Sequence, residues 1–193
     1  MSIRRVGQLG MSCAVLGAGV ALLLDARLGS DGYATLINGL HLSTGVAFWA
    51  VNVLVGAVFI LLAWARGIKP GPGTLVQPIV VGLTVSLLLP LTPHASSYAG
   101  RGAESIVAFV LLCIGVAGYL ASDLGAGPTE AAGLAWDPPV PFRWSYGAVQ
   151  LGGALVGWVL GADIGVATVL VVLLVGPAVD LVSRVVFRTT PSA

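Results

Sequence analysis

The sequence predicts an all-α integral membrane protein with six transmembrane helices, arranged as two inverted repeats of three helices. Three observations support this: an apolar composition, six apolar runs of membrane-spanning length, and a glycine and threonine motif present in both halves of the chain. Of the 193 residues, 57% are apolar and 9% are charged, whereas an ordinary soluble domain has about 25% charged residues. A span needs about 20 apolar residues, so six spans use most of the chain.

The apolar runs follow one another with only short segments between them. They cover residues 6–24, 46–65, 74–92, 105–121, 144–161 and 164–183. Lipid offers the backbone no hydrogen-bond partner, so each run is predicted to be a helix despite its valines. No connecting segment is long enough to bury a core of its own, which excludes a separate catalytic domain or a nucleic-acid-binding domain. The expected surroundings are the lipid bilayer, with no nucleic-acid partner.

Basic residues predict the orientation, because cytoplasmic loops retain Lys and Arg. With six spans and the N-terminus inside, the inner side collects Arg4, Arg5, Arg66, Lys69, Arg143, Arg184 and Arg188, and the outer side collects Arg27 and Arg101. This bias predicts that both termini are cytoplasmic. Trp49, Trp64, Trp144 and Tyr146 are expected near span ends, as anchors at the membrane interface.

An internal repeat appears when the two halves are aligned. Gly71-x-x-Thr74 recurs 94 positions later as Gly165-x-x-Thr168, at the entry to the sixth span. Three spans per repeat is an odd number, so the halves insert in opposite directions, as in many secondary transporters. The predicted division is 1–92 for the first repeat, 93–103 for the outer connecting loop and 104–193 for the second repeat. A duplication that only stabilises a bundle is the alternative.

The segments after the first and fourth spans are predicted to be short, broken or re-entrant half-helices. Each opens with Leu-Gly, offers a helix start at Ser30 or Asp31 in one case and at Gly127-Pro128 in the other, and closes at a Gly-Leu pair. Helices lying on the membrane surface are the alternative. The positions expected to act as structural breaks are Gly29, Gly71, Gly125, Pro128 and Gly165.

Six polar residues are the candidate substrate-binding set. They are Asp31, Asn52, Thr74, Glu130, Gln150 and Thr168. A half-helix N-terminus normally attracts an anion, but Asp31 and Glu130 already stand at the two predicted starts. We therefore expect a neutral, zwitterionic or cationic small molecule. The alternative is that the carboxylates cap helices and that the amides and hydroxyls join neighbouring helices.

No enzymatic chemistry is expected, because no constellation of catalytic side chains falls on neighbouring spans. His41 and His94 lie in outer loops without metal-ligand spacing, so neither a metal nor a cofactor is predicted. Asp180 is expected to pair with Arg184, one helical turn later. Small residues in the fifth span, Gly152-Gly153-x3-Gly157-x3-Gly161, permit close helix contact. That contact lies within the chain, in a homodimer, or with a partner membrane protein.

The chain resembles the YczE/YyaS family of bacterial integral membrane proteins. The resemblance rests on the Leu28-Gly29 segment, the Gly71-x-x-Thr74 entry and Val175-Gly176-Pro177-x2-Asp180. It implies a compact multi-span protein of the bacterial cytoplasmic (inner) membrane. It carries no catalytic residue, and some members of the family are associated with lipopeptide production as accessory factors.

Two functions are therefore expected. The first is a small secondary transporter or facilitator of a small molecule. The second is a non-transporting accessory or scaffold protein for a biosynthetic enzyme or exporter. Asn52, Gln150 and the Leu-Gly breaks should meet around one cavity in a transporter, whereas a filled apolar centre would favour the scaffold.

Overall fold

The computed structural model describes residues 2–92, 94–137 and 139–187, and all regular secondary structure in these ranges is helical. Arg188, counted above among the inner basic residues, lies outside the described residues. The α-helices are α1 Ile3–Ala26, α2 Gly32–Thr44, α3 Phe48–Ala65, α4 Pro72–Leu88, α5 Tyr98–Leu120, α6 Pro128–Leu134, α7 Phe142–Val159 and α8 Val166–Val182. A 3₁₀ turn, η1 Leu89–Leu91, extends α4, and a π-helical turn, η2 Ser183–Phe187, extends α8.

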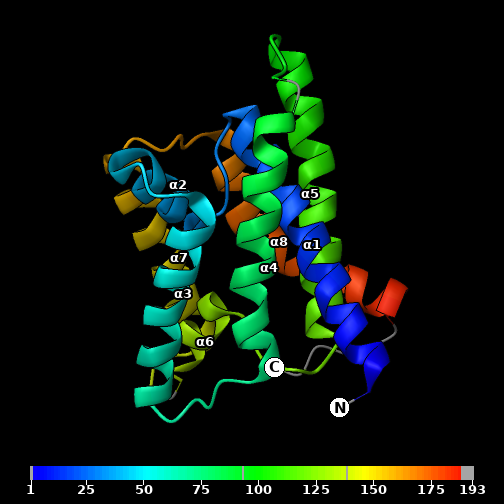
Figure 1. The fold of residues 1–193 in the computed structure, drawn as a ribbon, viewed down its shortest axis with the longest axis vertical. Coiled ribbons are helices and arrows are strands. Elements are labelled where there is room, and N and C mark those ends of the chain that lie inside the picture. The colour runs from blue at the N-terminus through cyan, green and yellow to red at the C-terminus, as the bar shows by residue number, and fades with distance from the viewer. Residues whose placement is uncertain (1, 93, 138, 188–193) are drawn as a thin grey trace.

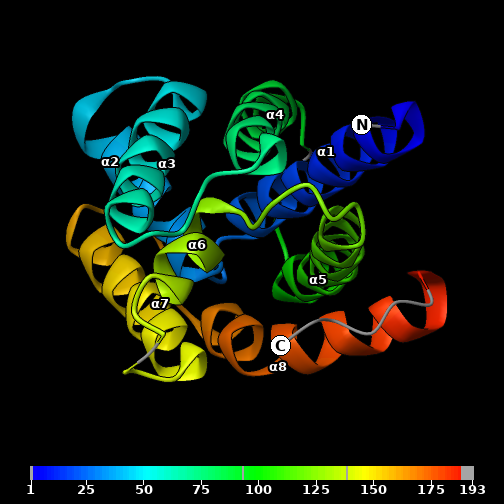
Figure 2. The ribbon, with the colours of Figure 1, turned by 90° about the horizontal axis from the view of Figure 1, so that it is seen from below.

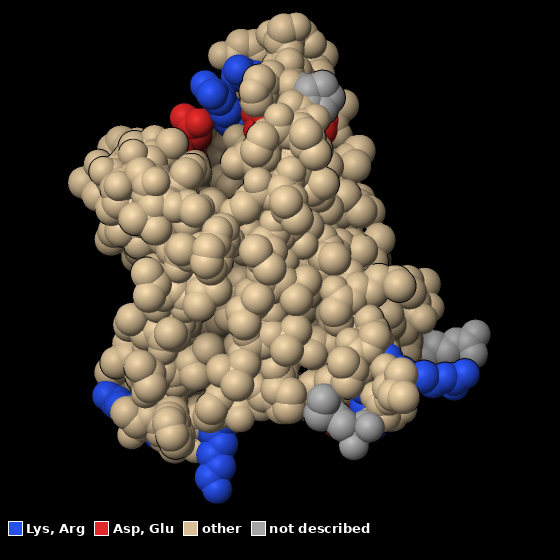
Figure 3. Space-filling view, in the orientation of Figure 1, with Lys and Arg blue, Asp and Glu red and all other residues tan. Residues whose placement is uncertain are grey.

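Among the residues that the structure describes, five helices are long and apolar enough to cross a membrane: α1, α3, α4 with η1, α5, and α8 with η2. This confirms the all-α membrane class. The helix α7 stands where the fifth span was expected and has 18 residues, as α3 does, but it is less apolar and is not among the five. Its sequence includes Arg143, Ser145 and Gln150, which lower its hydropathy. Figure 3 shows charged side chains near the two ends of the molecule and a band between them without such side chains.

The long helices surround a central pair. The helices α1 and α5 pack along each other in opposite directions, and α4 packs on α1 and on α3 (Figures 1 and 2). The short helix α2 lies along α7, α6 lies between α3 and α7, and α8 packs mainly on α5. The helix α1 begins at the end of the bundle toward which α8 runs (Figure 1).

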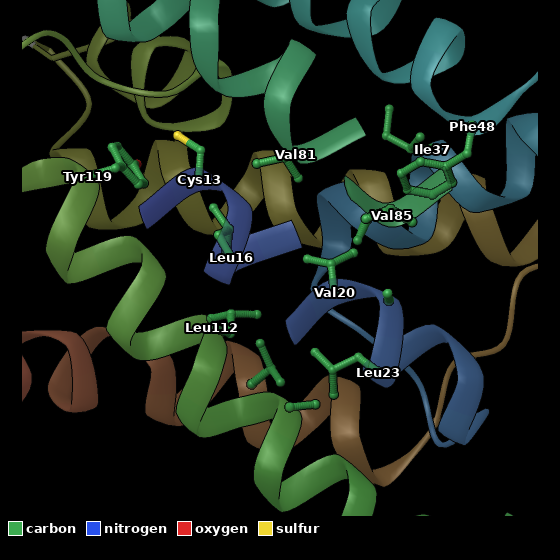
Figure 4. Packing of buried hydrophobic residues seen from close by; sticks show 14 of the residues in the cluster. Cys13, Leu16, Val20, Leu23, Ile37, Phe48, Val81, Val85, Leu112 and Tyr119 are labelled. Carbon is green, nitrogen blue, oxygen red and sulfur yellow. The ribbon is translucent and has the colours of Figure 1, made fainter. Parts of the chain in front are cut away.

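The hydrophobic core is built on α1. Figure 4 shows Leu16, Val20 and Leu23 of α1 beside Leu112 of α5 and Val85 of α4. Small residues allow the two central helices to touch, because a Cβ added to Gly115 would lie 2.6 Å from the Leu16 nitrogen. The helix α5 therefore lies directly against the α1 backbone.

The chain breaks after α1 and after α5 at glycines with positive φ, Gly29 at 99° and Gly125 at 123°. A residue that carries a side chain rarely adopts this backbone conformation. The carbonyl just before each break accepts a hydrogen bond from the start of a distant helix. Ala167 N of α8 donates to Leu28 O at 3.0 Å, and Gly73 N of α4 donates to Leu124 O at 2.8 Å. Each break is thus fastened to the first turn of a long helix from the other half of the chain.

The two short helices differ in length. The helix α6 ends at Leu134, as predicted, but α2 continues past its Gly-Leu pair to Thr44, so the predicted end of α2 was wrong. Gly39 does not end the helix because it packs against α7, where a Cβ at Gly39 would collide with Gly157 O, and the left-handed glycine that ends α2 is Gly45, with φ 72°. Five of the seven residues of α6 are buried, so α6 is not a surface helix.

Candidate functional site

A cavity of about 410 Å³ lies at the centre of the bundle, and residues from every α-helix or its cap line it. Its size falls within the range of small-molecule pockets, about 300 to 1,000 Å³. Four of the six predicted binding residues line it: Asp31, Asn52, Glu130 and Gln150. Thr74 and Thr168 do not. The apolar part of the wall comes mainly from α1, α5 and α8.

Asp31 is the N-cap of α2. Its Oδ1 accepts hydrogen bonds from Tyr33 N at 3.1 Å and from Ala34 N at 3.0 Å. An aspartate cap satisfies backbone N–H groups that otherwise lack a partner. The capping interpretation is therefore correct for this residue, and the same carboxylate also lines the cavity.

Gln150 connects α7 to the start of α2. Its Oε1 accepts a hydrogen bond from Tyr33 N at 3.0 Å, and its Nε2 donates to the Tyr146 hydroxyl at 2.9 Å. Both of its polar atoms are thus engaged, which fixes the side chain at the cavity wall. Tyr146 lines the cavity as well, so its predicted role as an interfacial anchor was wrong.

Asn52 joins α3 to α4. Its Nδ2 donates to Pro78 O at 2.6 Å, and its own backbone carbonyl accepts from the Tyr33 hydroxyl at 3.2 Å. In the same contact, Trp49 N donates to Ser86 Oγ at 3.0 Å. Asn52 therefore fastens two helices together while it also lines the cavity.

Glu130 differs from Asp31, because it stands inside the first turn of α6 and not at the N-cap, which is Gly127. Its Oε2 is buried and has no hydrogen-bond partner. The same is true of Gln77 Oε1 of α4 and of the Tyr119 hydroxyl of α5. The Tyr119 hydroxyl lies beside the Glu130 carboxylate and can donate a hydrogen bond to it. An unpartnered polar group in an apolar interior is costly, so the buried acceptors Glu130 Oε2 and Gln77 Oε1 make this cavity a candidate binding site.

Gly127 brings these three side chains together. A Cβ added to it would lie 2.5 Å from Glu130 Oε2, 3.2 Å from the Tyr119 hydroxyl and 3.3 Å from Gln77 Nε2. The side chains thus converge on the small volume that the glycine leaves free. Gly127 is also the N-cap of α6, so the break that starts this helix also makes room for the cluster.

The cavity is acidic. Its lining includes Asp31, Glu130 and, at the end of α8, Asp180, but no Lys, Arg or His among the side chains that the structure describes. The ion pair expected between Asp180 and Arg184 is not formed in the described chain. The ion pairs found there, Arg5 with Asp123 and His94 with Asp25, do not involve the residues of the cavity wall.

Thr74 and Thr168 lie at the starts of α4 and α8. Thr74 Oγ1 accepts from Gly71 N at 3.1 Å, and Thr168 Oγ1 accepts from Gly165 N at 3.4 Å. These are capping contacts. Their role in substrate binding stays a prediction, and Thr74 lines a smaller pocket between α3, α4 and α6.

The two sides of the cavity are closed to different degrees. On one side, which we name the α3–α4 seam, Asn52 and Trp49 hold α4, and a Cβ at Gly82 would lie 3.0 Å from the Trp49 Cα. On the other, which we name the α7–α8 seam, residues of both helices face the cavity, and a Cβ at Gly176 would meet no atom within 4 Å. The cavity therefore extends between α7 and α8.

Sequence reasoning missed several residues of the cavity wall. Tyr33, Tyr119 and Gln77 were not among the candidate binding residues. Tyr119 lies just before the break at Gly125, and Tyr33 lies just after the break at Gly29. Proximity to a break is the signal that could have identified both tyrosines.

Comparisons with known proteins agree with the predicted resemblance. The family described as "Family of unknown function (DUF6198)" matches residues 3–184. A Haemophilus influenzae "Uncharacterized protein" is 24% identical over 176 residues, which cover 90% of this chain and 81% of that protein. The Bacillus subtilis "Uncharacterized membrane protein YczE" is 23% identical over 171 residues, which cover 84% of this chain and 77% of the relative. No solved structure matches.

Proposed function

This chain belongs to the DUF6198 family of membrane proteins, and we propose that it is a secondary transporter or facilitator of a small neutral, zwitterionic or cationic molecule. The observation that carries the proposal is the central cavity with Glu130 Oε2 unpartnered in its wall. Polar and ionisable groups inside a membrane bundle are costly and usually mark a substrate or ion path. An accessory protein with a filled apolar centre would not need them.

The proposal includes two inverted repeats, residues 1–92 and 104–193. Its support is a set of contacts that occur twice. The carbonyl before Gly29 binds the start of α8, and the carbonyl before Gly125 binds the start of α4. Thr74 and Thr168 cap those starts in the same way. In many transporters, a substrate site lies at the interface of such repeats, next to helices broken within the membrane.

A transport cycle follows from the unequal seams. If the repeats exchange conformations, the α7–α8 seam closes while the α3–α4 seam opens, and the cavity becomes accessible from the other side. We place both termini in the cytoplasm of a bacterial cell, on the basis of the basic residues listed above. The open α7–α8 seam lies toward the end of α8, so the conformation described here would face the cytoplasm.

Labelling of single cysteines tests this proposal without knowledge of the substrate. In a background with Cys13→Ala and Cys113→Ala, Ser86→Cys reports on the α3–α4 seam and Asp180→Cys on the α7–α8 seam. A membrane-impermeant maleimide is added to one side of oriented membrane vesicles or to the other. Transport predicts that Asp180→Cys reacts from the inner side and Ser86→Cys from the outer side.

Ala117→Cys is the matched control, because position 117 is 0% exposed and reacts only if the bundle unfolds. A scaffold that holds one conformation predicts reaction at Asp180→Cys and none at Ser86→Cys from either side. That result would contradict transport. Labelling of Ser2→Cys from the outer side would contradict the orientation.

A further inference from the structure

We propose that the cavity binds the protonated amino group of a small amine that lacks a carboxylate, with Glu130, Asp31 and Gln77 as acceptors. This inference rests on the proposed function, and it narrows the substrate from neutral, zwitterionic or cationic molecules to one class. The binding end is the cluster around Gly127, and the ligand body lies among the apolar residues of α1 and α5.

Two acidic side chains share the wall of the cavity. Asp31 and Glu130 face one cavity and are close enough to interact electrostatically. No basic side chain described in the structure lines that cavity. In a medium of low dielectric constant, two carboxylates without a counter-charge are costly. A cationic ligand supplies the missing charge and also reduces the repulsion between the two acids.

The unpartnered hydrogen-bond acceptors of the cavity select the kind of cation. Glu130 Oε2 and Gln77 Oε1 are acceptors without a donor. Both oxygen atoms are shielded from solvent, so bulk water does not solvate them. An ammonium group offers up to three N–H donors in a compact volume. A quaternary ammonium has none, so it would leave both acceptors unpartnered.

Aromatic and apolar residues complete the site. Tyr33, Tyr119, Tyr146 and Phe142 line the polar end, and aromatic faces attract cations. Leu16, Val20, Leu112 and Val116 continue the wall from α1 and α5. A carboxylate on the ligand would find no positive side chain among those described at the cavity, so an amine is preferred to the corresponding amino acid.

Binding to the purified full-length protein tests this inference. The probes are phenethylamine and isopentylamine at pH 7, each with three analogues of similar shape: the corresponding alcohol, the trimethylammonium derivative and the amino acid with one added carboxylate, phenylalanine or leucine. Thermal stabilisation and calorimetry give the affinity. We expect at least one amine to bind about tenfold or more tightly than all three of its analogues, because only the amine satisfies both charge and donors.

Variants locate the binding. Glu130→Gln should weaken amine binding by about tenfold or more, as expected for loss of a charged hydrogen-bond partner. Glu104→Gln, the other glutamate of the chain, lies outside the cavity lining and should leave binding unchanged. Should Glu130→Gln fail to fold, the ligand series on the unmodified protein decides the question alone.

Two results would overturn the inference. One is an affinity for both amines that is no higher than for their alcohols or amino acids, and the other is unchanged amine binding in a folded Glu130→Gln protein. If neither amine binds preferentially but Ser86→Cys is still labelled from the outer side, the amine is rejected as the ligand and the transport proposal stands. Amine binding without that labelling would support the site and reject transport.

Discussion

The two seams of the bundle contain similar sequence elements but are closed differently. At the α3–α4 seam, two hydrogen bonds join the helices, and Gly82 lies against the backbone of α3. At the α7–α8 seam, Gly176 has open space beside it, and the helices enclose part of the cavity. Gly82 and Gly176 are separated by the same 94 positions as the two motif threonines.

The comparison teaches that a repeated sequence need not produce two identical interfaces. Both glycines permit close helix contact, and only Gly82 makes one in this conformation. Alternating access requires two seams of matching sequence that differ in structure, because each conformation closes one seam and opens the other. The predictions below test this comparison, starting with the largest expected effect.

The largest effect is expected at the two breaks. Gly29→Ala and Gly125→Ala should each lower the free energy of unfolding by about 3 kcal/mol, since both place a side chain at positive φ and against a motif threonine. Thermal unfolding in detergent measures this. Gly45→Ala is the matched control, with φ 72° and no atom within 4 Å, and should lose only about 1 kcal/mol. If only one of Gly29→Ala and Gly125→Ala lost much of its free energy of unfolding, the two breaks would not be equivalent.

Substitutions of the two seam glycines should change the stability of the protein by different amounts. Gly82→Ala should cost about 2 kcal/mol, because the new methyl group lies 3.0 Å from the Trp49 Cα. Gly176→Ala should be nearly neutral in stability, because nothing lies beside it. If α8 must close on α7 during transport, the same variant should still reduce uptake. Equal stability losses in the two variants would show that the seams are alike.

Asn52→Leu tests the main fastening of the α3–α4 seam. Loss of the bond from Nδ2 to Pro78 O should cost about 1 kcal/mol, the usual value for a polar contact between membrane helices. It should also raise outer labelling of Ser86→Cys, because the seam opens more often. Gln150→Leu is the matched control, since Gln150 fastens α2 and not α8. More outer labelling with Gln150→Leu than with Asn52→Leu would contradict this assignment.

The smallest effect is expected for Ser86→Ala. Its Oγ accepts one bond from Trp49 N, and its loss should cost about 0.6 kcal/mol. We expect the midpoint of thermal unfolding to fall slightly. Ser43→Ala, at an exposed position outside both seams, should not change it. A larger loss than in Asn52→Leu would place the main fastening at Ser86 instead.

Much of the fold could be predicted, because it depends on local properties. Apolar runs, a positive φ at Gly29 and a proline at the first residue of α6 act over a few residues, and five membrane-spanning helices and both breaks follow from them. The expected fifth span, α7, is not among those five helices, because it carries polar residues toward the cavity. The end of α2 was missed because Gly39 packs against α7, and the left-handed glycine that ends the helix is Gly45.

The site could be predicted only in part. Four of six proposed residues line one cavity, since polar side chains near a break or within a span face the interior of the bundle and not the lipid. Thr74 and Thr168 have the same polarity, yet their hydroxyls cap helices. Tyr119 and Gln77 acquire their importance from Glu130, which lies on a different helix, and no spacing in the sequence records that proximity.

By itself, the sequence determined the membrane class, the helical backbone and the places where the helices break, because these depend on hydropathy, backbone hydrogen bonding and glycine or proline conformation within one segment. The tertiary structure alone decided which seam is closed and which polar atoms are left without a partner. Both depend on distances between segments far apart in the chain, such as Glu130, Gln77 and Tyr119 around Gly127. A buried acceptor becomes a binding group only when its surroundings provide no donor.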